Sequence, residues 1–172
     1  NSEDNEPYVF IGGITRPKKD FHSNNYRQLV HSLHLQNINV WIHSTPHNSY
    51  PSCILPVWKF TTSELSEEKW AEAIGNAAWV LCPYNTKSQT VTGIIGESIS
   101  VGTNVLCTSF PYSLEMSEKY NEYVVVNDDF NLWPEIIHSN ITKFNRPNYP
   151  NWNDFVLDLL KVIEVTASNS SK

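Results

Sequence analysis

Residues 79–111, WVLCPYNTKSQTVTGIIGESISVGTNVLCTSFP, predict one strand–helix–strand unit of a parallel sheet. An apolar strand, a polar loop, a short helix and a second apolar strand are expected over Trp79–Pro83, Tyr84–Thr90, Val91–Val101 and Asn104–Thr108. Gly102 is expected to end the helix. Parallel sheets bind ligands beyond the carboxyl ends of their strands, which is where this helix would begin.

The start of that helix suits an anionic group, because the first-turn amides lack partners within the helix and the helix dipole is positive there. The polar run Ser88–Thr90 would add side chains to such a site. Gly93 and Gly96 have a simpler explanation, since glycine also lets a helix pack closely against a sheet. Glu97 lies further along the helix and would face either the ligand edge or solvent, and the pattern leaves both open.

The composition indicates one folded domain over residues 1–172, with residues 1–6 and 167–172 expected to be frayed ends. A hydrophobic content of 40% with 6 tryptophans favours a globule over disorder. A net charge of −6 without a concentrated basic patch argues against nucleic-acid binding. No apolar run has the length of a membrane span, so we expect a cytoplasmic location, or a peripheral one at the inner face of the membrane. Cys53, Cys82 and Cys107 form no C-x-x-C motif, which favours a reducing compartment, and Cys82 and Cys107 lie in predicted core strands.

Strands and helices are expected to alternate along the rest of the chain. Further strands are predicted over Tyr8–Ile11, Asn39–His43, Val57–Phe60 and Tyr123–Asn127. Helices are predicted over Tyr26–Leu35, from the cap Ser66 through Ala77, and over Leu132–Ser139 and Asn153–Val165, with helical turns in a loop over Tyr112–Tyr120. Strands alternating with helices in this way predict an α/β, Rossmann-like fold with a doubly wound parallel sheet.

The first predicted strand is followed by Gly12 and Gly13, which are expected to form a sharp turn. They are not part of a G-x-G-x-x-G dinucleotide motif. The pair would either let a phosphate approach the backbone or only turn the chain. Arg16, Lys18 and Lys19 come next, and they would either meet a diphosphate or form a solvated basic loop.

The histidines show no metal-binding spacing, so no metal site is expected. His31 and His34 are predicted to lie on a solvated helix face. His22, His43 and His47 flank predicted strand ends, and each is a candidate to enter a site. The sequence has no nucleophile elbow, no Walker loop and no paired aspartates for a metal-bound diphosphate.

Three parts of the sequence occur in a recognisable order. The glycine pair with its basic loop comes first, LSEEKWAEAIGNAAWVLCPY follows, and SQTVTGIIGESISVG then leads into NVLCT. From about Tyr8 to Thr108 this order resembles the C-terminal, donor-binding domain of retaining glycosyltransferases with the GT-B fold. That family has a glutamate motif, E-x-x-x-x-x-x-x-E, before a glycine and an apolar strand. Glu97 matches the second glutamate, and Gln89 stands in place of the first.

The resemblance implies a nucleotide-diphosphate sugar as the donor substrate and metal-independent transfer with retention, without a cofactor. Glu97 would bind the ribose hydroxyls of the donor, and Arg16 with Lys18 or Lys19 would neutralise the diphosphate. Arg16, Lys19 and Gln89 would carry the catalysis, although Gln89 cannot place a negative charge beside the reacting carbon. Further donor contacts are expected from Gly12, Gly13, Phe60, Thr61, Thr90, Val91 and Thr92.

A GT-B site lies in a cleft between two domains. The resemblance therefore implies that the acceptor is bound by an N-terminal domain outside this chain. The acceptor would be a glycan or another molecule, as in polysaccharide biosynthesis, and any membrane contact would be made by the parts outside this chain.

Two other functions fit the same residues. The sequence GIIGE, Gly93–Glu97, resembles the G-x-x-x-E phrase of nucleoside deoxyribosyltransferase-like and nucleotide-hydrolase-like enzymes, in which the glutamate attacks C1 of the sugar. The basic loop, and the separate strand and helix between Val57 and Ala78, argue against that interpretation. A non-catalytic interaction module of the same fold is the third hypothesis, and Gln89 is its best support.

Overall fold

The computed structural model describes residues 6–14, 24–44, 56–84 and 92–141. These residues form six strands and five helices. The strands are β1 (Tyr8–Ile14), β2 (Asn39–Ser44), β3 (Lys59–Thr61), β4 (Trp79–Cys82), β5 (Asn104–Cys107) and β6 (Val124–Val126). The helices are α1 (Asn24–Leu35), α2 (Glu67–Gly75), α3 (Gly93–Val101), α4 (Pro111–Lys119) and α5 (Trp133–Ile141).

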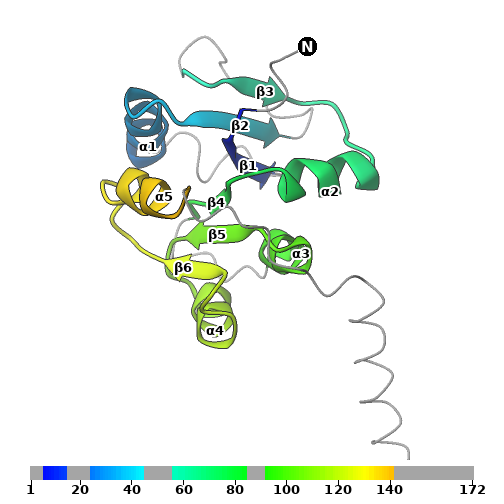
Figure 1. Ribbon diagram of the computed structural model, residues 1–172, viewed down its shortest axis with the longest axis vertical. Coiled ribbons are helices and arrows are strands. Elements are labelled where there is room, and N and C mark those ends of the chain that lie inside the picture. The colour runs from blue at the N-terminus through cyan, green and yellow to red at the C-terminus, as the bar shows by residue number, and fades with distance from the viewer. Residues whose placement is uncertain (1–5, 15–23, 45–55, 85–91, 142–172) are drawn as a thin grey trace, which may run out of the picture.

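All the strands pair in parallel in one sheet with the order β3-β2-β1-β4-β5-β6 (Figure 1). The chain runs outward from β1 through β2 to β3, and then crosses back through α2 to β4 on the other side of β1. The strand order therefore reverses between β1 and β4, which is the point where such sheets bind ligands. The predicted α/β, doubly wound parallel sheet is confirmed.

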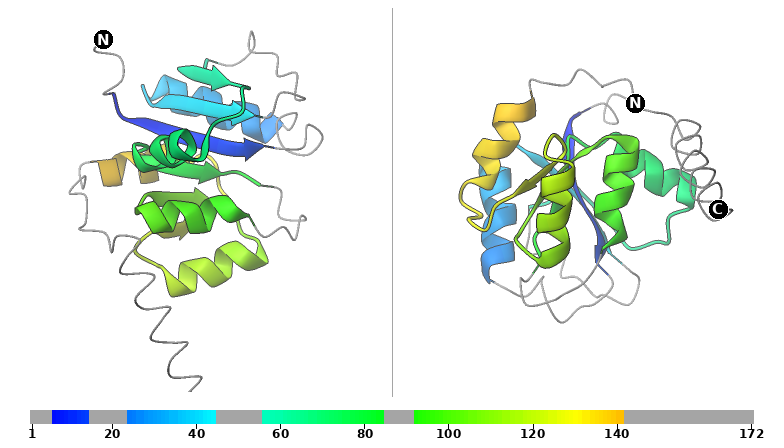
Figure 2. Two further views of the ribbon diagram at one scale, coloured as in Figure 1. Left: turned by 90° about the vertical axis from the view of Figure 1, so that its right-hand side faces the viewer. Right: turned by 90° about the horizontal axis from the view of Figure 1, so that it is seen from below.

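The helices cover both faces of the sheet (Figure 2). Helices α1 and α5 pack on one face, where Val9 and Ile11 of β1 point, and we call it the α1/α5 face. Helices α2, α3 and α4 pack on the other, the α2/α3/α4 face, which receives Phe10. This division follows from the alternation of side chains along a strand. It assigns every side chain of a strand to one layer of the core.

Each of the six segments predicted as strands forms a strand of the sheet, and the short β3 pairs with the edge of β2. One prediction about the first half of the chain is corrected. The chain makes no sharp turn at Gly12 and Gly13, since both lie inside β1. Ile11 pairs with Ile42 and Ile14 pairs with Ser44, so β1 has one extra residue there and forms a β-bulge.

The segment after β5 is also more regular than expected. The predicted loop with helical turns is a helix, α4, over Pro111–Lys119. Pro111 has the fixed φ that suits a first helical position. The Ser113 hydroxyl accepts a hydrogen bond from the Phe110 amide at 2.9 Å. These local contacts start the helix, although its sequence has little amphipathic pattern.

Several local predictions are confirmed. The Ser66 hydroxyl caps α2 by accepting a hydrogen bond from the Lys69 amide at 3.3 Å. Gly102 ends α3 in the left-handed conformation, with a φ of 71°. Cys82 and Cys107 are buried, directly opposite each other on β4 and β5. The histidines of α1, His31 and His34, are exposed.

Other predictions fall on residues that the structure does not describe. They concern Cys53, His22, His47, the frayed ends apart from Glu6, and the helix over Asn153–Val165. None of the described helices combines the length and the apolar character needed to cross a bilayer.

Candidate functional site

The predicted site residues are divided between described and undescribed segments. Arg16, Lys18, Lys19, Gln89, Thr90 and Val91 lie outside the described residues, so their roles stay predictions. The first three follow β1 and the others follow β4, and these two strands are neighbours in the sheet. Gly13 is described only as part of β1. Gly12, Phe60, Thr61, Thr92 and Glu97 have a described environment.

Glu97 lies on the exposed side of α3, and one oxygen of its carboxylate has a hydrogen-bond donor on α2. Oε2 accepts a hydrogen bond from the indole Nε1 of Trp70 at 2.7 Å. Oε1 lies near Gly93, four residues earlier in the helix. A Cβ built on Gly93 would be 3.1 Å from Oε1. Helical side chains lean toward the N-terminus of their helix, so the carboxylate sits at the first turn of α3.

Trp70 of α2 also belongs to the candidate site, although no sequence motif marks it. Its ring packs edge-on against Phe10, at 5.4 Å between ring centroids, and against His43, at 5.7 Å. The edge of the indole also covers Gly12. A Cβ at Gly12 would overlap the Phe10 ring and lie 2.7 Å from Cη2 of Trp70. The indole that binds Glu97 therefore packs against the bulged end of β1.

His43 and Thr61 continue this arrangement across β2 and β3. The distance between His43 Nδ1 and Thr61 Oγ1 is 2.9 Å, and Trp41 Nε1 donates to the same hydroxyl oxygen at 3.0 Å. Burial lowers the pKa of His43, which favours the neutral imidazole. Glu97, Trp70, His43 and Thr61 thus form a continuous row on the α2/α3/α4 face, which we call the Glu97–Thr61 row.

Phe60 and Thr92 lie beside this row without joining it. The Phe60 side chain packs against the core of the α1/α5 face, on the opposite side of β3 from Thr61. Thr92 is the N-cap residue of α3, but its side chain makes no capping hydrogen bond. The Thr92 hydroxyl instead lies 3.4 Å from that of Tyr84.

The described cysteines are poorly suited to nucleophilic catalysis, and the described residues offer no group of metal ligands. Burial raises the pKa of the Cys107 thiol to about 12 and raises that of Cys82 well above its ordinary value. Buried thiols of this kind are poor nucleophiles. In the part of the chain that the structure describes, no three His, Cys, Asp or Glu side chains are grouped closely enough to hold a metal ion.

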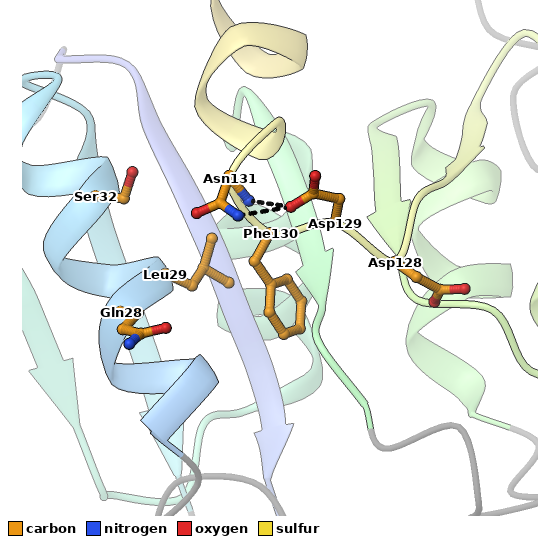
Figure 3. A pocket seen from close by; sticks show the side chains of 7 residues that line it. All are labelled: Gln28, Leu29, Ser32, Asp128, Asp129, Phe130 and Asn131. Carbon is orange, nitrogen blue, oxygen red and sulfur yellow. Dashed lines mark hydrogen bonds between the residues drawn. The ribbon is translucent and has the colours of Figure 1, made fainter.

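A separate pocket of about 160 Å³ lies on the α1/α5 face, between α1 and the segment that joins β6 to α5 (Figure 3). Its two carboxylates bind neighbouring groups. Asp128 accepts hydrogen bonds from the amide and the hydroxyl of Ser109, at 2.7 and 2.5 Å. Asp129 accepts two from Asn131, at 3.0 and 2.8 Å. None of the predicted site residues lines this pocket, which is therefore not the candidate site.

No family model matches this chain, and no curated protein matches it. The functions suggested by resemblance therefore remain hypotheses, to be weighed against the geometry of the Glu97–Thr61 row.

Proposed function

We propose that this protein breaks the N-glycosidic bond of a nucleoside-type substrate, with Glu97 as the nucleophile. The observation that carries the proposal is the position of the Glu97 carboxylate over Gly93, at the first turn of α3. Helix α3 follows β4, so this turn lies by the point where the strand order reverses. A residue with a Cβ at position 93 would crowd Oε1, which gives the G-x-x-x-E sequence a physical reason.

The geometry favours this function over donor-phosphate binding for two reasons. First, the space beside the α-carbon of Gly12 is filled by the rings of Phe10 and Trp70, so that glycine already has a packing role. Second, the strand and helix between Val57 and Ala78, which argued against a nucleoside enzyme, hold residues of the Glu97–Thr61 row. Helix α2 supplies the indole bound to Glu97, and β3 supplies Thr61.

The proposed reaction has two steps. In the first, a carboxylate oxygen of Glu97 forms a bond to C1′ of the sugar while the C1′–N bond breaks. The electron pair of that bond passes to the base nitrogen, which takes up a proton from solvent. In the second, water or another base attacks C1′ and loses a proton, and the carboxylate is released. Water gives hydrolysis, and a second base gives transfer.

The first experiment measures free base, by chromatography, after incubation of the protein with ribonucleosides and 2′-deoxyribonucleosides. Glu97→Gln keeps the size of the side chain and an oxygen for the Trp70 indole, but a neutral amide is a poor nucleophile. We expect this variant to lose at least about 1,000-fold in rate. Glu115→Gln, which changes an exposed glutamate of α4, is the matched control and should retain full activity.

A second experiment tests the covalent step itself. A nucleoside with fluorine at C2′ disfavours positive charge at C1′, so the glycosyl ester should form and then persist. Mass spectrometry of the intact protein is expected to show one added glycosyl group, on a peptide that contains Glu97. Base release without any such adduct, and with Glu97→Gln fully active, would rule out Glu97 as the nucleophile.

The donor-binding domain of a retaining glycosyltransferase is the second candidate. The start of α3 favours it, because among the described residues the Thr92 side chain does not cap the first-turn amides that would bind a phosphate. In this case uridine or guanosine diphosphate would stabilise the domain, by about 2.7 kcal/mol at 100 times the dissociation constant. Glu97→Ala should abolish the shift in melting temperature.

These two assays separate the three hypotheses. Base release from nucleosides supports the nucleoside enzyme, and a thermal shift with a nucleoside diphosphate but no base release supports the donor-binding domain. A protein that gives neither result, and that associates tightly with another protein, would be the non-catalytic interaction module.

A further inference from the structure

We infer that Trp70 is the positioning residue for Glu97, and that it selects Oε1 as the attacking oxygen. This inference rests on the proposed function. The indole Nε1 donates to Oε2 at 2.7 Å, a short distance that is typical of hydrogen bonds to charged acceptors. The other oxygen lies over Gly93, at the first turn of α3.

The indole can position the carboxylate because its own place is fixed. Phe10 of β1 and His43 of β2 meet the ring edge-on, with interplanar angles of 73° and 66°. The far edge of the ring rests on Gly12, where any side chain would collide with it. The ring is thus held by two adjacent strands, while α2 holds its backbone. A donor fixed in this way can hold a flexible glutamate in one orientation at little cost in entropy.

A neutral donor suits this role better than a cation would. An arginine or lysine beside Glu97 would hold the carboxylate as an ion pair and weaken it as a nucleophile. The indole N–H has no charge and donates a single hydrogen bond. When Oε1 bonds to C1′ and the base leaves with the electron pair of the C1′–N bond, Oε2 becomes the carbonyl oxygen of the glycosyl ester. The indole can donate to Oε2 both before and after that step.

The test compares two tryptophan-to-phenylalanine variants in the full chain. Trp70→Phe keeps an aromatic ring on Gly12 but removes the donor to Glu97. Trp133→Phe removes an indole donor that serves a main-chain carbonyl, the oxygen of Asn127 at 3.0 Å, on the α1/α5 face. We expect Trp70→Phe to lower kcat for base release by about 10-fold to 100-fold with little change in KM. Trp133→Phe should lose stability while its kcat stays at the wild-type value.

A spectroscopic measurement makes the test independent of turnover. The indole proton of Trp70, assigned by its loss in Trp70→Phe, should resonate downfield because its acceptor is a carboxylate. In Glu97→Ala that resonance should move upfield, while the indole proton of Trp133 should not move.

The outcomes separate failure of the inference from failure of the proposed function. An active wild-type protein with an equally active Trp70→Phe variant contradicts the positioning role alone. The same holds if the Trp70 resonance does not respond to Glu97→Ala. A wild-type protein that releases no base from any nucleoside contradicts the proposed function, and with it any catalytic role of Trp70, even if the resonance moves.

Discussion

Each face of the sheet has a tryptophan whose indole N–H has a defined acceptor, but the two acceptors differ in kind. On the α1/α5 face, Trp133 is fully buried, packs edge-on against Phe130 at 4.9 Å and donates to a main-chain carbonyl. On the α2/α3/α4 face, Trp70 is partly exposed and donates to the carboxylate of Glu97. The first indole is buried in the core, and the second binds an ionisable group at the surface.

A similar contrast exists among the polar groups of the α2/α3/α4 face itself. Buried hydroxyls on the helices and turns of the α2/α3/α4 face donate to main-chain carbonyls, as Ser98 does to Ile94 and Thr103 to Ile74, at 2.6 and 2.8 Å. Their hydrogen bonds are satisfied within the fold. The Glu97 carboxylate is different, because it is exposed and accepts its hydrogen bond from an indole of another helix.

Gly12→Ala is expected to have the largest effect on stability, because the new side chain would clash with the rings that pack on Gly12. The new Cβ would overlap the Phe10 ring and lie 2.7 Å from Trp70 Cη2, so both rings must shift. Overpacking of this kind costs about 1–3 kcal/mol. For a domain of this size the melting temperature should fall by roughly 2–4 °C per kcal/mol. Thermal unfolding followed by circular dichroism measures the loss.

A second glycine variant is the matched control for this prediction. A Cβ at Gly75, the last residue of α2, would have no neighbour within 4 Å. Gly75→Ala should therefore leave the melting temperature unchanged or raise it slightly. If Gly12→Ala were as stable as Gly75→Ala, the packing of Trp70 on β1 would be wrong, and the contrast between the two indoles would lose its basis.

Gly93→Ala should lower activity without lowering stability. Alanine is a better helix former than glycine, so the variant should be as stable as the wild type or more stable, by up to about 1 kcal/mol. The new Cβ would lie 3.1 Å from Oε1 of Glu97 and push the carboxylate by a few tenths of an ångström. We expect base release to slow by about 10-fold, since catalysis depends on the placement of the nucleophile. Equal activity in this variant would contradict the proposed position of Oε1.

The sequence predicted the parts of the fold that local chemistry decides. The apolar run of β4, the cap at Ser66 and the left-handed end of α3 at Gly102 each follow from residues within a few positions of one another. The bulge at Gly12 could not be predicted in this way. It depends on the register between β1 and β2, which no local pattern contains.

The candidate site was harder to predict than the fold, because its decisive contact joins two helices. Glu97 was selected from its place on the helix after β4 and from its match to the second glutamate of the GT-B motif, and His43 was one of several histidines at predicted strand ends. Trp70 was not selected, because it shares a helix face with Ala73 and Ile74, a position that is typical of core residues. Its Nε1 needs an acceptor, and that requirement was the one signal of another role. Which acceptor it finds depends on how α2 and α3 rotate against each other, and the sequence does not specify that.

The pH dependence of stability is the smallest effect that we predict, and it tests the middle of the Glu97–Thr61 row. Burial lowers the pKa of His43, so the native protein keeps this imidazole neutral at a pH where the unfolded chain already binds a proton. The unfolded state then binds more protons than the native state, and stability falls as the pH drops below about 6.5, the ordinary histidine value. His43→Gln removes this contribution while keeping a side chain that can hydrogen-bond to Thr61.

We therefore expect the melting temperature to change less between about pH 7.5 and pH 5.5 in His43→Gln than in the wild type. Taking the difference between the two proteins cancels the titratable groups that they share. An equal change in both proteins would mean that the His43 ring has the same access to protons in the folded and unfolded chains. In that case the edge of the Trp70 indole would not shield it, and the α2/α3/α4 face would be open between β2 and α2 rather than closed around the indole that holds Glu97.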